Sequence, residues 1–310
     1  EVITKLEMFC QVPKKRILIN TDVSNIYKVP LTFFNQGLMN FLCERMNISN
    51  SPIGISDWEE VVKPFETSYH HIRVAIIGKY TKLHDSYVSL IHAIKHASTK
   101  CKVYPEIVWI ESSNLENDIY PNGTWEDISK CECAIIPGGF GVRGILGMVK
   151  AAEYLRKSEI PTLGICLGMQ VMVVEAALNI WGLKSANSSE FKEYNDESVI
   201  TLIDGQDGKK GGTMRLGSMK TIIREGSKAH DIYKKTETHE RHRHRYEVNP
   251  LYMDKYPEYF SGNSQDHNVA DIFEIKTNKF YVGCQFHPEY KTHPSECHPL
   301  FENLIKSASL

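Results

Sequence analysis

Short apolar runs alternate with longer mixed segments along the chain from Ile72 onward. Each run has the length and composition of a buried strand, and the segments between the runs place apolar residues at helical spacing. The expected strands cover residues 74–78, 103–110, 134–136 and 162–165, and the expected helices cover 86–97, 145–157 and 171–178. Strands that alternate with helices predict a parallel sheet with right-handed crossovers.

The second half of this region carries more strand and turn signals. The expected strands there cover residues 199–203, 219–224, 245–248, 269–275 and 280–287, and a last helix covers 299–307. Strands that follow one another indicate antiparallel additions at one side of the sheet. We therefore expect an α/β fold, with a mostly parallel central sheet flanked by helices and with antiparallel additions.

Residues 1–71 depart from this regular pattern. They contain short apolar pieces, one expected helix from Leu31 to Arg45, and polar tracts at 47–52 and 58–66. These pieces are too short to close a core of their own. We interpret residues 1–71 as the tail of another domain plus a linker, and residues 72–310 as the main domain.

The composition narrows the classes of partner and compartment. The 310 residues are 42% hydrophobic and 24% charged, with a formal net charge of −2, which gives no general argument for nucleic acid or an anionic membrane. No apolar run approaches the roughly 20 residues that span a bilayer and nothing resembles a signal peptide, so we expect a cytoplasmic protein. The eight cysteines are expected to be reduced thiols rather than a disulfide framework.

The stretch from Pro161 to Gln170 predicts a buried strand, a tight turn and the start of a helix, with Cys166 at the corner. We expect Gly164 and Gly168 to let the backbone turn sharply and to keep side chains away from a substrate. A thiol at a helix N-terminus is favoured as the thiolate, which is the nucleophilic form. The alternative is that Cys166 is a small buried hydrophobe.

A glycine-rich loop, residues 137–141, follows one of the expected strands. It is a candidate oxyanion hole, in which the amides of Gly139 and Leu167 would face a tetrahedral intermediate. A plain turn is the alternative. Phosphate binding is the usual alternative function of a glycine-rich loop. However, the chain has no Gly-x-x-x-x-Gly-Lys-Ser/Thr motif.

A nucleophilic thiolate needs a base, and the base needs a group that orients it. His287 and Glu289, at the end of the last expected strand, supply both on the same side of the chain. Pro288 fixes the backbone between them. A structural histidine at a strand end is the alternative.

The densest basic run is Glu240-Arg241-His242-Arg243-His244-Arg245-Tyr246. A solvated strand, a nucleic-acid surface and a histidine metal site are three interpretations, of which the near-zero net charge disfavours nucleic acid. Alternation along a strand would place the arginines on one face and the histidines on the other. An arginine from this run that holds an α-carboxylate would suit an amide-hydrolysing site.

Taken together, these motifs resemble the class I glutamine amidotransferases. The resemblance rests on residues 137–141, 164–170 and 287–289. It implies that Cys166 attacks the side-chain amide of glutamine, with His287 and Glu289 completing a catalytic triad. Ammonia leaves, and water then hydrolyses the glutamyl thioester.

The resemblance also assigns substrate contacts by motif position. Gly139 and Leu167 would supply the oxyanion amides, Glu190 suits the α-ammonium group of glutamine and Arg245 suits its α-carboxylate. The expected substrate-binding residues are Gly139, Phe140, Leu167, Gly168, Met169, Gln170, Glu190 and Arg245.

Further stretches resemble one branch of this family, in which the glutaminase is joined to an amidoligase domain. They cover residues 26–30, 77–80, 186–191, 212–217 and 241–248, of which 212–217 resemble a mobile lid over the glutamine site. For the full-length enzyme the resemblance implies ATP-dependent conversion of UTP to CTP in pyrimidine nucleotide biosynthesis. It also implies Mg²⁺, GTP as activator of the glutaminase, and a homotetramer.

The chain departs from that branch in two respects. It has no phosphate-binding loop, and residues 1–71 resemble only the end of the amidoligase domain. We therefore expect no cofactor and no metal in this chain, no CTP synthesis by it alone, and low activity, because lid closure depends on the missing domain. The chain is also shorter than the branch pattern between Glu190 and Gly211, where residues 204–210 form a bridge.

Two other functions stay open at this point. A hydrolase of γ-glutamyl peptides would keep the fold and the triad, but would give no reason for Glu190 and Arg245 to bracket a free amino acid. A non-enzymatic regulatory module would keep the fold alone, and the complete set of Cys166, His287 and Glu289 argues against it.

Overall fold

The computed structural model describes residues 1–48, 55–67, 69–116, 123–191, 195–202, 214–265 and 269–309. The chain divides into two compact units, Glu1–Ser68 and Tyr69–Leu310. All eight cysteines are free thiols. Within the described ranges, no helix combines the length and the apolar character needed to cross a membrane.

The first unit consists of helices and short turns. Its helices are α1 (Val2–Cys10), α2 (Val29–Asn35), α3 (Leu38–Met46) and α4 (Ser56–Val62). The single helix that the sequence predicted over residues 31–45 is wrong, because Gly37, with a φ of 85°, separates α2 from α3. Cys43 and Val62 are the only buried hydrophobic side chains among the described residues of this unit, so it has almost no core of its own.

The second unit is built on a nine-stranded sheet in the order β2-β1-β3-β4-β12-β11-β10-β7-β8. The first five strands in this order pair in parallel and the others pair antiparallel. The parallel strands are β1 (His71–Gly78), β2 (Tyr104–Glu111), β3 (Cys133–Ile136), β4 (Thr162–Ile165) and β12 (Tyr281–Cys284). The antiparallel strands are β7 (Arg215–Ile223), β8 (Glu237–His244), β10 (Phe260–Ser264) and β11 (Ala270–Glu274). The predicted mostly parallel sheet with antiparallel additions is confirmed.

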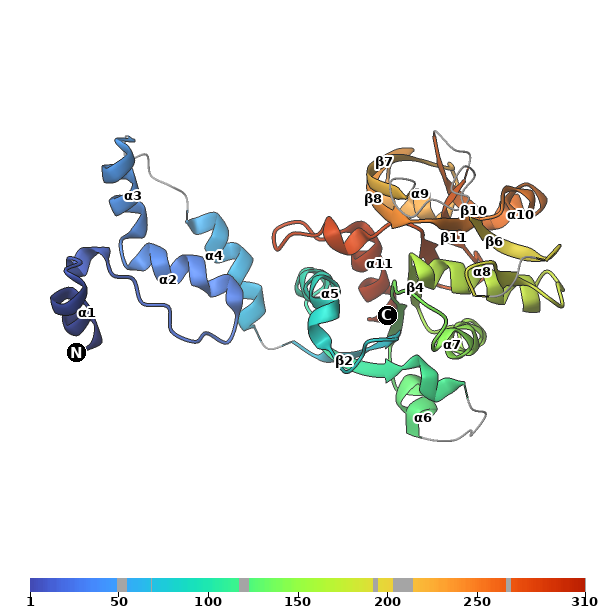
Figure 1. Cartoon of the computed structure of the whole chain (residues 1–310), viewed down its shortest axis with the longest axis horizontal. Coiled ribbons are helices and arrows are strands. Elements are labelled where there is room, and N and C mark those ends of the chain that lie inside the picture. Colours follow the sequence, from blue (N-terminus) through green and yellow to red (C-terminus); the bar gives the residue numbers. More distant parts are fainter. Residues whose placement is uncertain are drawn as a thin grey trace. The chain divides into compact units, whose positions relative to one another are not determined.

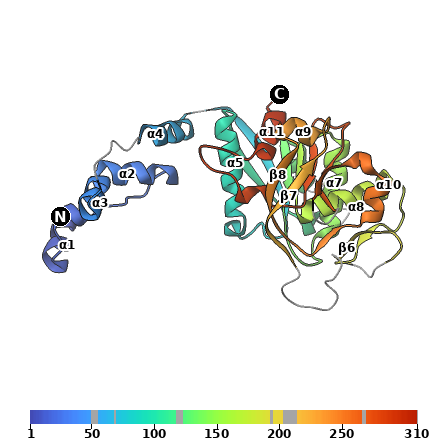
Figure 2. The same cartoon turned by 90° about the horizontal axis from the view of Figure 1, so that it is seen from above.

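Helices cover both faces of the sheet (Figure 1). They are α5 (Val88–Lys100), α6 (Gly123–Ser129), α7 (Ile145–Lys157), α8 (Leu167–Asn179), α9 (Lys228–Tyr233), α10 (Pro250–Lys255) and α11 (Pro299–Ala308). One apolar cluster joins one face of the sheet to α6, α7 and α8, and a second joins the other face to α5, α9 and α11. Figure 2 shows the sheet between α5 on one side and α8 on the other.

A small second sheet contains β5 (Asn187–Ser188), β6 (Ser198–Leu202) and β9 (Tyr246–Val248). The pairing that matters most for the site is in the main sheet, where Ile165 of β4 lies opposite Cys284 of β12. Because these strands are parallel, their carboxyl ends meet at one edge of the sheet. The residues that follow each strand, Cys166 and Gln285, are therefore brought together from distant parts of the chain.

Candidate active site

Cys166 occupies a strained backbone position between β4 and α8. Its φ is 53° and its ψ is −104°, a conformation that costs a non-glycine residue about 1–3 kcal/mol. Its N–H donates to the carbonyl of Cys284 at 2.7 Å, and its own carbonyl accepts from the N–H of Gln170 at 3.2 Å. The corner predicted from the sequence is therefore present, and the strain falls on the cysteine itself.

The two glycines that flank the cysteine act differently from our expectation. Neither Gly164 nor Gly168 has a positive φ, so the expectation that they supply the turn is wrong. A Cβ on Gly164 would lie 2.2 Å from the sulfur of Met172, and one on Gly168 would lie 1.9 Å from the carbonyl oxygen of Ile136. Both glycines therefore let α8 pack closely on β3 and β4.

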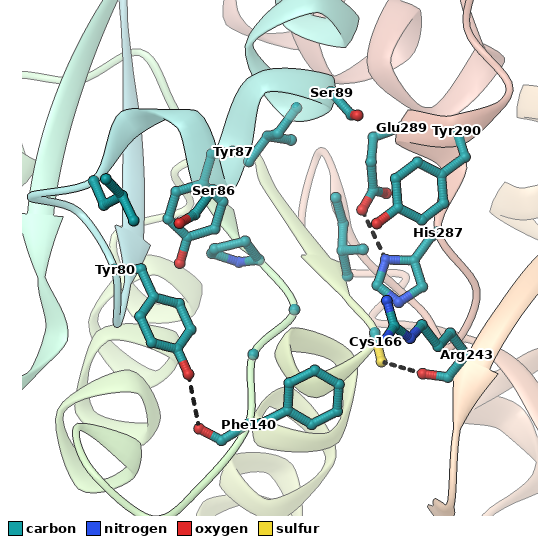
Figure 3. Close-up of a pocket in the computed structure, with 16 residues that line it drawn as sticks. Tyr80, Ser86, Tyr87, Ser89, Phe140, Cys166, Arg243, His287, Glu289 and Tyr290 are labelled. Atoms are coloured by element: carbon teal, nitrogen blue, oxygen red, sulfur yellow. Dashed lines mark hydrogen bonds and ion pairs between the residues drawn. The ribbon is translucent and has the colours of Figure 1, made fainter. Parts of the chain in front are cut away.

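His287 and Glu289 lie beside the corner. Nδ1 of His287 is 2.7 Å from Oε1 of Glu289, so the carboxylate accepts the Nδ1 proton and leaves Nε2 for another partner. Figure 3 shows the imidazole ring between Glu289 and the sulfur of Cys166. The main-chain N–H of His287 donates to the carbonyl of Arg241 on β8, which fixes the histidine from its other side.

The surroundings of His287 favour the imidazolium. Burial alone would lower its pKa, but hydrogen bonds and charge interactions with Cys166 and Glu289 outweigh burial and raise the pKa to about 11. A histidine that is protonated beside a cysteine stabilises the thiolate. The arrangement therefore supports a thiolate–imidazolium pair.

The glycine-rich loop after β3 faces the same corner. A Cβ on Gly138 would lie 3.1 Å from Cε1 of His287 and 3.6 Å from Cβ of Cys166, and a Cβ on Gly139 would lie 3.5 Å from a methyl carbon of Leu167. Leu167 is the first residue of α8, where main-chain amides lack a partner within the helix. The loop and the helix N-terminus thus lie together at this corner, with Gly138 beside Cys166 and Gly139 beside Leu167.

Lys79 holds this loop in place, a role that the sequence analysis missed. Its ammonium group donates to the carbonyls of Phe140, at 3.3 Å, and of Gly141. The hydroxyl of Tyr80 adds a longer contact to the Phe140 carbonyl at 3.4 Å (Figure 3). Lys79 is only 2% exposed, and burial lowers its pKa to about 8, although Glu190 partly opposes that shift. Its position directly after β1 predicts only that Lys79 lies at the carboxyl edge of the sheet, and not which carbonyls it contacts.

A cavity of about 370 Å³ joins the corner to the predicted substrate residues. Its walls include seven side chains or backbones that we singled out from the sequence: Gly139, Phe140, Cys166, Leu167, Gln170, Glu190 and Arg245. Burial raises the pKa of Glu190, and Lys79 partly offsets that shift. A second cavity, of about 480 Å³, shares Cys166 with the first, and His287 and Glu289 are among the residues that line it.

Gly168 and Met169 do not line either cavity. Both are buried in α8, and a Cβ on Gly283 of β12 would lie 2.9 Å from Cγ of Met169. Their side of the helix packs on the sheet. The cavity walls instead include Arg243 and Met214, which we had not singled out as site residues.

Gln285 is the other residue that sequence reasoning left without a role. Its side chain is fully buried. Its Nε2 lies 3.7 Å from the sulfur of Cys166, and its Oε1 accepts from Nε2 of Gln170 at 3.1 Å. The period of two along a strand predicts that Gln285 and His287 lie on the same side, but not that Gln285 faces Cys166.

The basic run alternates as the sequence predicted. Arg241 and Arg243 are exposed, whereas His242 and His244 are buried. Burial, with a smaller contribution from Arg215, lowers the pKa of His242 to about 2 and that of His244 to about 3, so both rings are neutral. Among the residues that the structure describes, no group of three histidine, cysteine or carboxylate side chains is placed to hold a metal ion.

The predicted lid is only partly described. Gly212 and Thr213 lie outside the described residues, as does the bridge at 204–210. Arg215 to Gly217 belong to β7, and the guanidinium of Arg215 pairs with the buried carboxylate of Asp271 at 3.1 Å. This part of the segment is therefore anchored to the sheet.

Comparisons with known proteins cover nearly the whole chain. A family model described as glutamine amidotransferase class-I matches residues 82–307, and a model described as CTP synthase N-terminus matches residues 1–48. The CTP synthase of Hydrogenobaculum sp. is 39% identical over 99% of this chain and 57% of its own length. That of Sulfolobus acidocaldarius is 40% identical over 98% of this chain and 58% of its own length.

The chain thus spans a little over half the length of the curated relatives that it matches. Among solved structures, the glutaminase domain of the Trypanosoma brucei CTPS, with bound acivicin, superposes with a TM-score of 0.71. It is 32% identical, and the match covers 77% of this chain and 94% of that one.

Proposed function

The chain belongs to the class I glutamine amidotransferases, with the glutaminase domain of CTP synthase as its counterpart, and from this premise we propose a catalytic role for each site residue. Cys166 is the nucleophile, His287 the general acid and base, and Glu289 the group that orients His287. The observation that carries the proposal is the cavity of about 370 Å³ that connects Cys166 to Glu190 and Arg245.

Substrate binding follows from two opposite charges in the wall of the cavity, Glu190 and Arg245. Glu190 binds the α-ammonium group of L-glutamine and Arg245 binds its α-carboxylate, since each pairs with a group of opposite charge. Phe140 and Gln170 line the same cavity. The side-chain amide of glutamine then reaches Cys166.

The reaction proceeds through two tetrahedral intermediates. The thiolate of Cys166 forms a bond to the amide carbon, and the oxyanion accepts from the amides of Gly139 and Leu167. His287 gives its Nε2 proton to the leaving nitrogen, so ammonia departs and a glutamyl thioester remains.

Hydrolysis of the thioester regenerates the site. Neutral His287 takes a proton from water, and the resulting hydroxide attacks the thioester carbon. A second oxyanion forms at the amides of Gly139 and Leu167 and collapses to release glutamate and the thiolate. The Glu289 carboxylate stabilises the imidazolium at each protonated stage, as 2.7 Å separates its Oε1 from Nδ1.

The longer protein would use the ammonia. Residues 1–48 match the N-terminal model of CTP synthase, so we assign residues 1–71 to the end of an amidoligase domain plus a linker and residues 72–310 to the glutaminase domain. With that whole domain, ATP and Mg²⁺, the ammonia converts UTP to CTP, with GTP as activator, in a cytoplasmic homotetramer. The glutaminase step needs no cofactor.

The test compares glutamate release by the wild type with that by Cys166→Ala. We expect activity only in the wild type, and an adduct of acivicin, the ligand of the Trypanosoma brucei relative, on Cys166 by mass spectrometry. Equal glutamate release by both proteins would refute the assignment. Faster hydrolysis of γ-glutamyl peptides than of glutamine would overturn the substrate.

A further inference from the structure

The side chain of Gln285 links the nucleophile to the wall of the glutamine cavity. It lies one residue beyond β12 and is fully buried. Its Nε2 is 3.7 Å from the sulfur of Cys166, and its Oε1 is 3.1 Å from Nε2 of Gln170. Gln170 in turn donates to the main-chain carbonyl of Tyr246 at 2.9 Å.

The direction of these hydrogen bonds follows from chemistry. The carbonyl of Tyr246 can only accept, so Gln170 must present its NH₂ group to it. The second N–H of the same group then points to Gln285, which must offer its oxygen. The NH₂ group of Gln285 is thereby turned toward the sulfur of Cys166. The backbone carbonyl of Tyr246 thus fixes which group donates and which accepts in the hydrogen bonds that run from Gln170 through Gln285 to Cys166.

We propose that Gln285 is a positioning residue that donates a hydrogen bond to the Cys166 thiolate and fixes the orientation of Gln170. This inference rests on the proposed glutaminase function. A neutral thiol is a weak acceptor, whereas a thiolate is a charged one, so the donor stabilises the reactive form selectively. At the same time, both N–H bonds of Gln170 are used, which leaves its carboxamide oxygen as the group that it offers to N–H donors of glutamine.

Other groups also act on the sulfur, and the effect of Gln285 adds to theirs. His287 stabilises the thiolate by charge, whereas Gln285 contributes a neutral donor that does not itself titrate. Several titratable or charged groups line the two cavities beside the sulfur or interact with it: Tyr80, Tyr87, Glu190, Arg243, His244, Arg245, Tyr246, Cys284, His287, Glu289 and Tyr290.

Two variants separate the two roles of Gln285. Gln285→Met has similar length but neither donates to the sulfur nor accepts from Gln170. Gln285→Glu keeps an acceptor for Gln170 but replaces the donor with a carboxylate. Tyr281→Phe is the matched control, because it removes a buried hydrogen bond on the same strand, from the Tyr281 hydroxyl to the carbonyl of Ala152 at 3.1 Å, away from the site.

The first readout is the rate at which iodoacetamide alkylates Cys166 between pH 5 and 10. Mass spectrometry of the peptide that contains Cys166 measures this rate. We expect Cys166 to be alkylated roughly tenfold more slowly in both Gln285 variants than in the wild type at pH values where the thiolate is the minor form. The control should superimpose on the wild type. The second readout is the KM for glutamine, which should rise several-fold in Gln285→Met and stay within about twofold of the wild type in Gln285→Glu.

Unchanged alkylation profiles in folded Gln285→Met and Gln285→Glu would overturn the proposal. Should neither variant fold, the side-chain amide signals of Gln285 in the wild type decide by NMR: they must move when iodoacetamide alkylates Cys166, and signals that stay fixed refute the contact. Alkylation requires no glutamine, so a wild type that fails to hydrolyse glutamine would disprove the function without removing the test of Gln285.

Discussion

Replacing Glu289 by glutamine tests how much of the reactivity depends on the charge beside His287. The two side chains are equally shielded, each 11% exposed, and 2.7 Å separates Oε1 from Nδ1. Glutamine keeps the shape and an acceptor for the Nδ1 proton, and its NH₂ group can take the place of Oε2, which has no hydrogen-bond partner among the residues that the structure describes. The substitution therefore removes the negative charge of Glu289 and largely preserves the geometry of its contact with His287.

The expected loss follows from the difference between charged and neutral hydrogen bonds. A hydrogen bond to a charged group contributes about 1.5–3 kcal/mol and a neutral one about 0.5–1.5 kcal/mol. The difference of about 1–2 kcal/mol corresponds to a roughly 5- to 30-fold lower kcat/KM for glutamine. The pKa of His287, which Cys166 and Glu289 together raise to about 11 against the effect of burial, should fall in the variant. The imidazolium form should then be lost at a lower pH.

The assay measures kcat/KM for glutamate release, and separately the alkylation of Cys166, between pH 6 and 10. Glu302→Gln is a suitable control, because Glu302 is 14% exposed and pairs with lysines far from the corner. A Glu289→Gln enzyme with the activity and pH profile of the wild type would refute the role assigned to this carboxylate.

Three further predictions concern the cavity, the packing and the buried histidines. Glu190→Gln should raise the KM for glutamine by roughly 10- to 100-fold with little change in kcat, because it removes the charge expected at the α-ammonium group; an unchanged KM in steady-state kinetics would contradict this. Gly168→Ala should lower the free energy of unfolding by about 1–3 kcal/mol or more in urea titrations, since its Cβ would lie 1.9 Å from the carbonyl oxygen of Ile136, and a variant as stable as the wild type would show that α8 can shift. In the folded protein, burial lowers the pKa of His242 to about 2 and that of His244 to about 3. In the unfolded chain both histidines titrate near pH 6.5. The stability that comes from their neutral forms is therefore full above pH 6.5 and is lost as the pH falls below it. In urea titrations, the free energy of unfolding should fall by about 1.4 kcal/mol per pH unit for each histidine as the pH drops below 6.5. This pH dependence should be shallower in His242→Gln than in the wild type, and equal slopes in the two proteins would refute the assignment.

Much of the fold and the nucleophilic corner could be predicted because local pattern determines them. Apolar runs of strand length and helical periodicity predicted the alternating half of the sheet. A period of two correctly placed His242 and His244 inside and Arg241 and Arg243 outside. The break at Gly37 was missed because periodicity continued across it, whereas the backbone there adopts a φ of 85°.

What could not be predicted depends on contacts between segments far apart in the sequence. Lys79 could not be identified as the group that holds the glycine-rich loop, since its acceptors Phe140 and Gly141 are about sixty residues away. Gln285 likewise faces Cys166 only because β12 pairs with β4. Strand order is a tertiary property, and propensity or spacing along one segment does not encode it.

The same strand order explains how the strain at Cys166 is maintained. A backbone with a φ of 53° persists only where neighbouring structure determines it, at a cost of about 1–3 kcal/mol. Here β4 is paired with β3 on one side and β12 on the other. Helix α8 packs so closely on these strands that there is no space for a Cβ at Gly164, Gly168 or Gly283. Burial of the apolar faces of α8 and the sheet offsets the strain. The glycines around the nucleophile therefore serve the chemistry through packing, because a helix held further from the sheet would let the corner relax and move the sulfur away from His287.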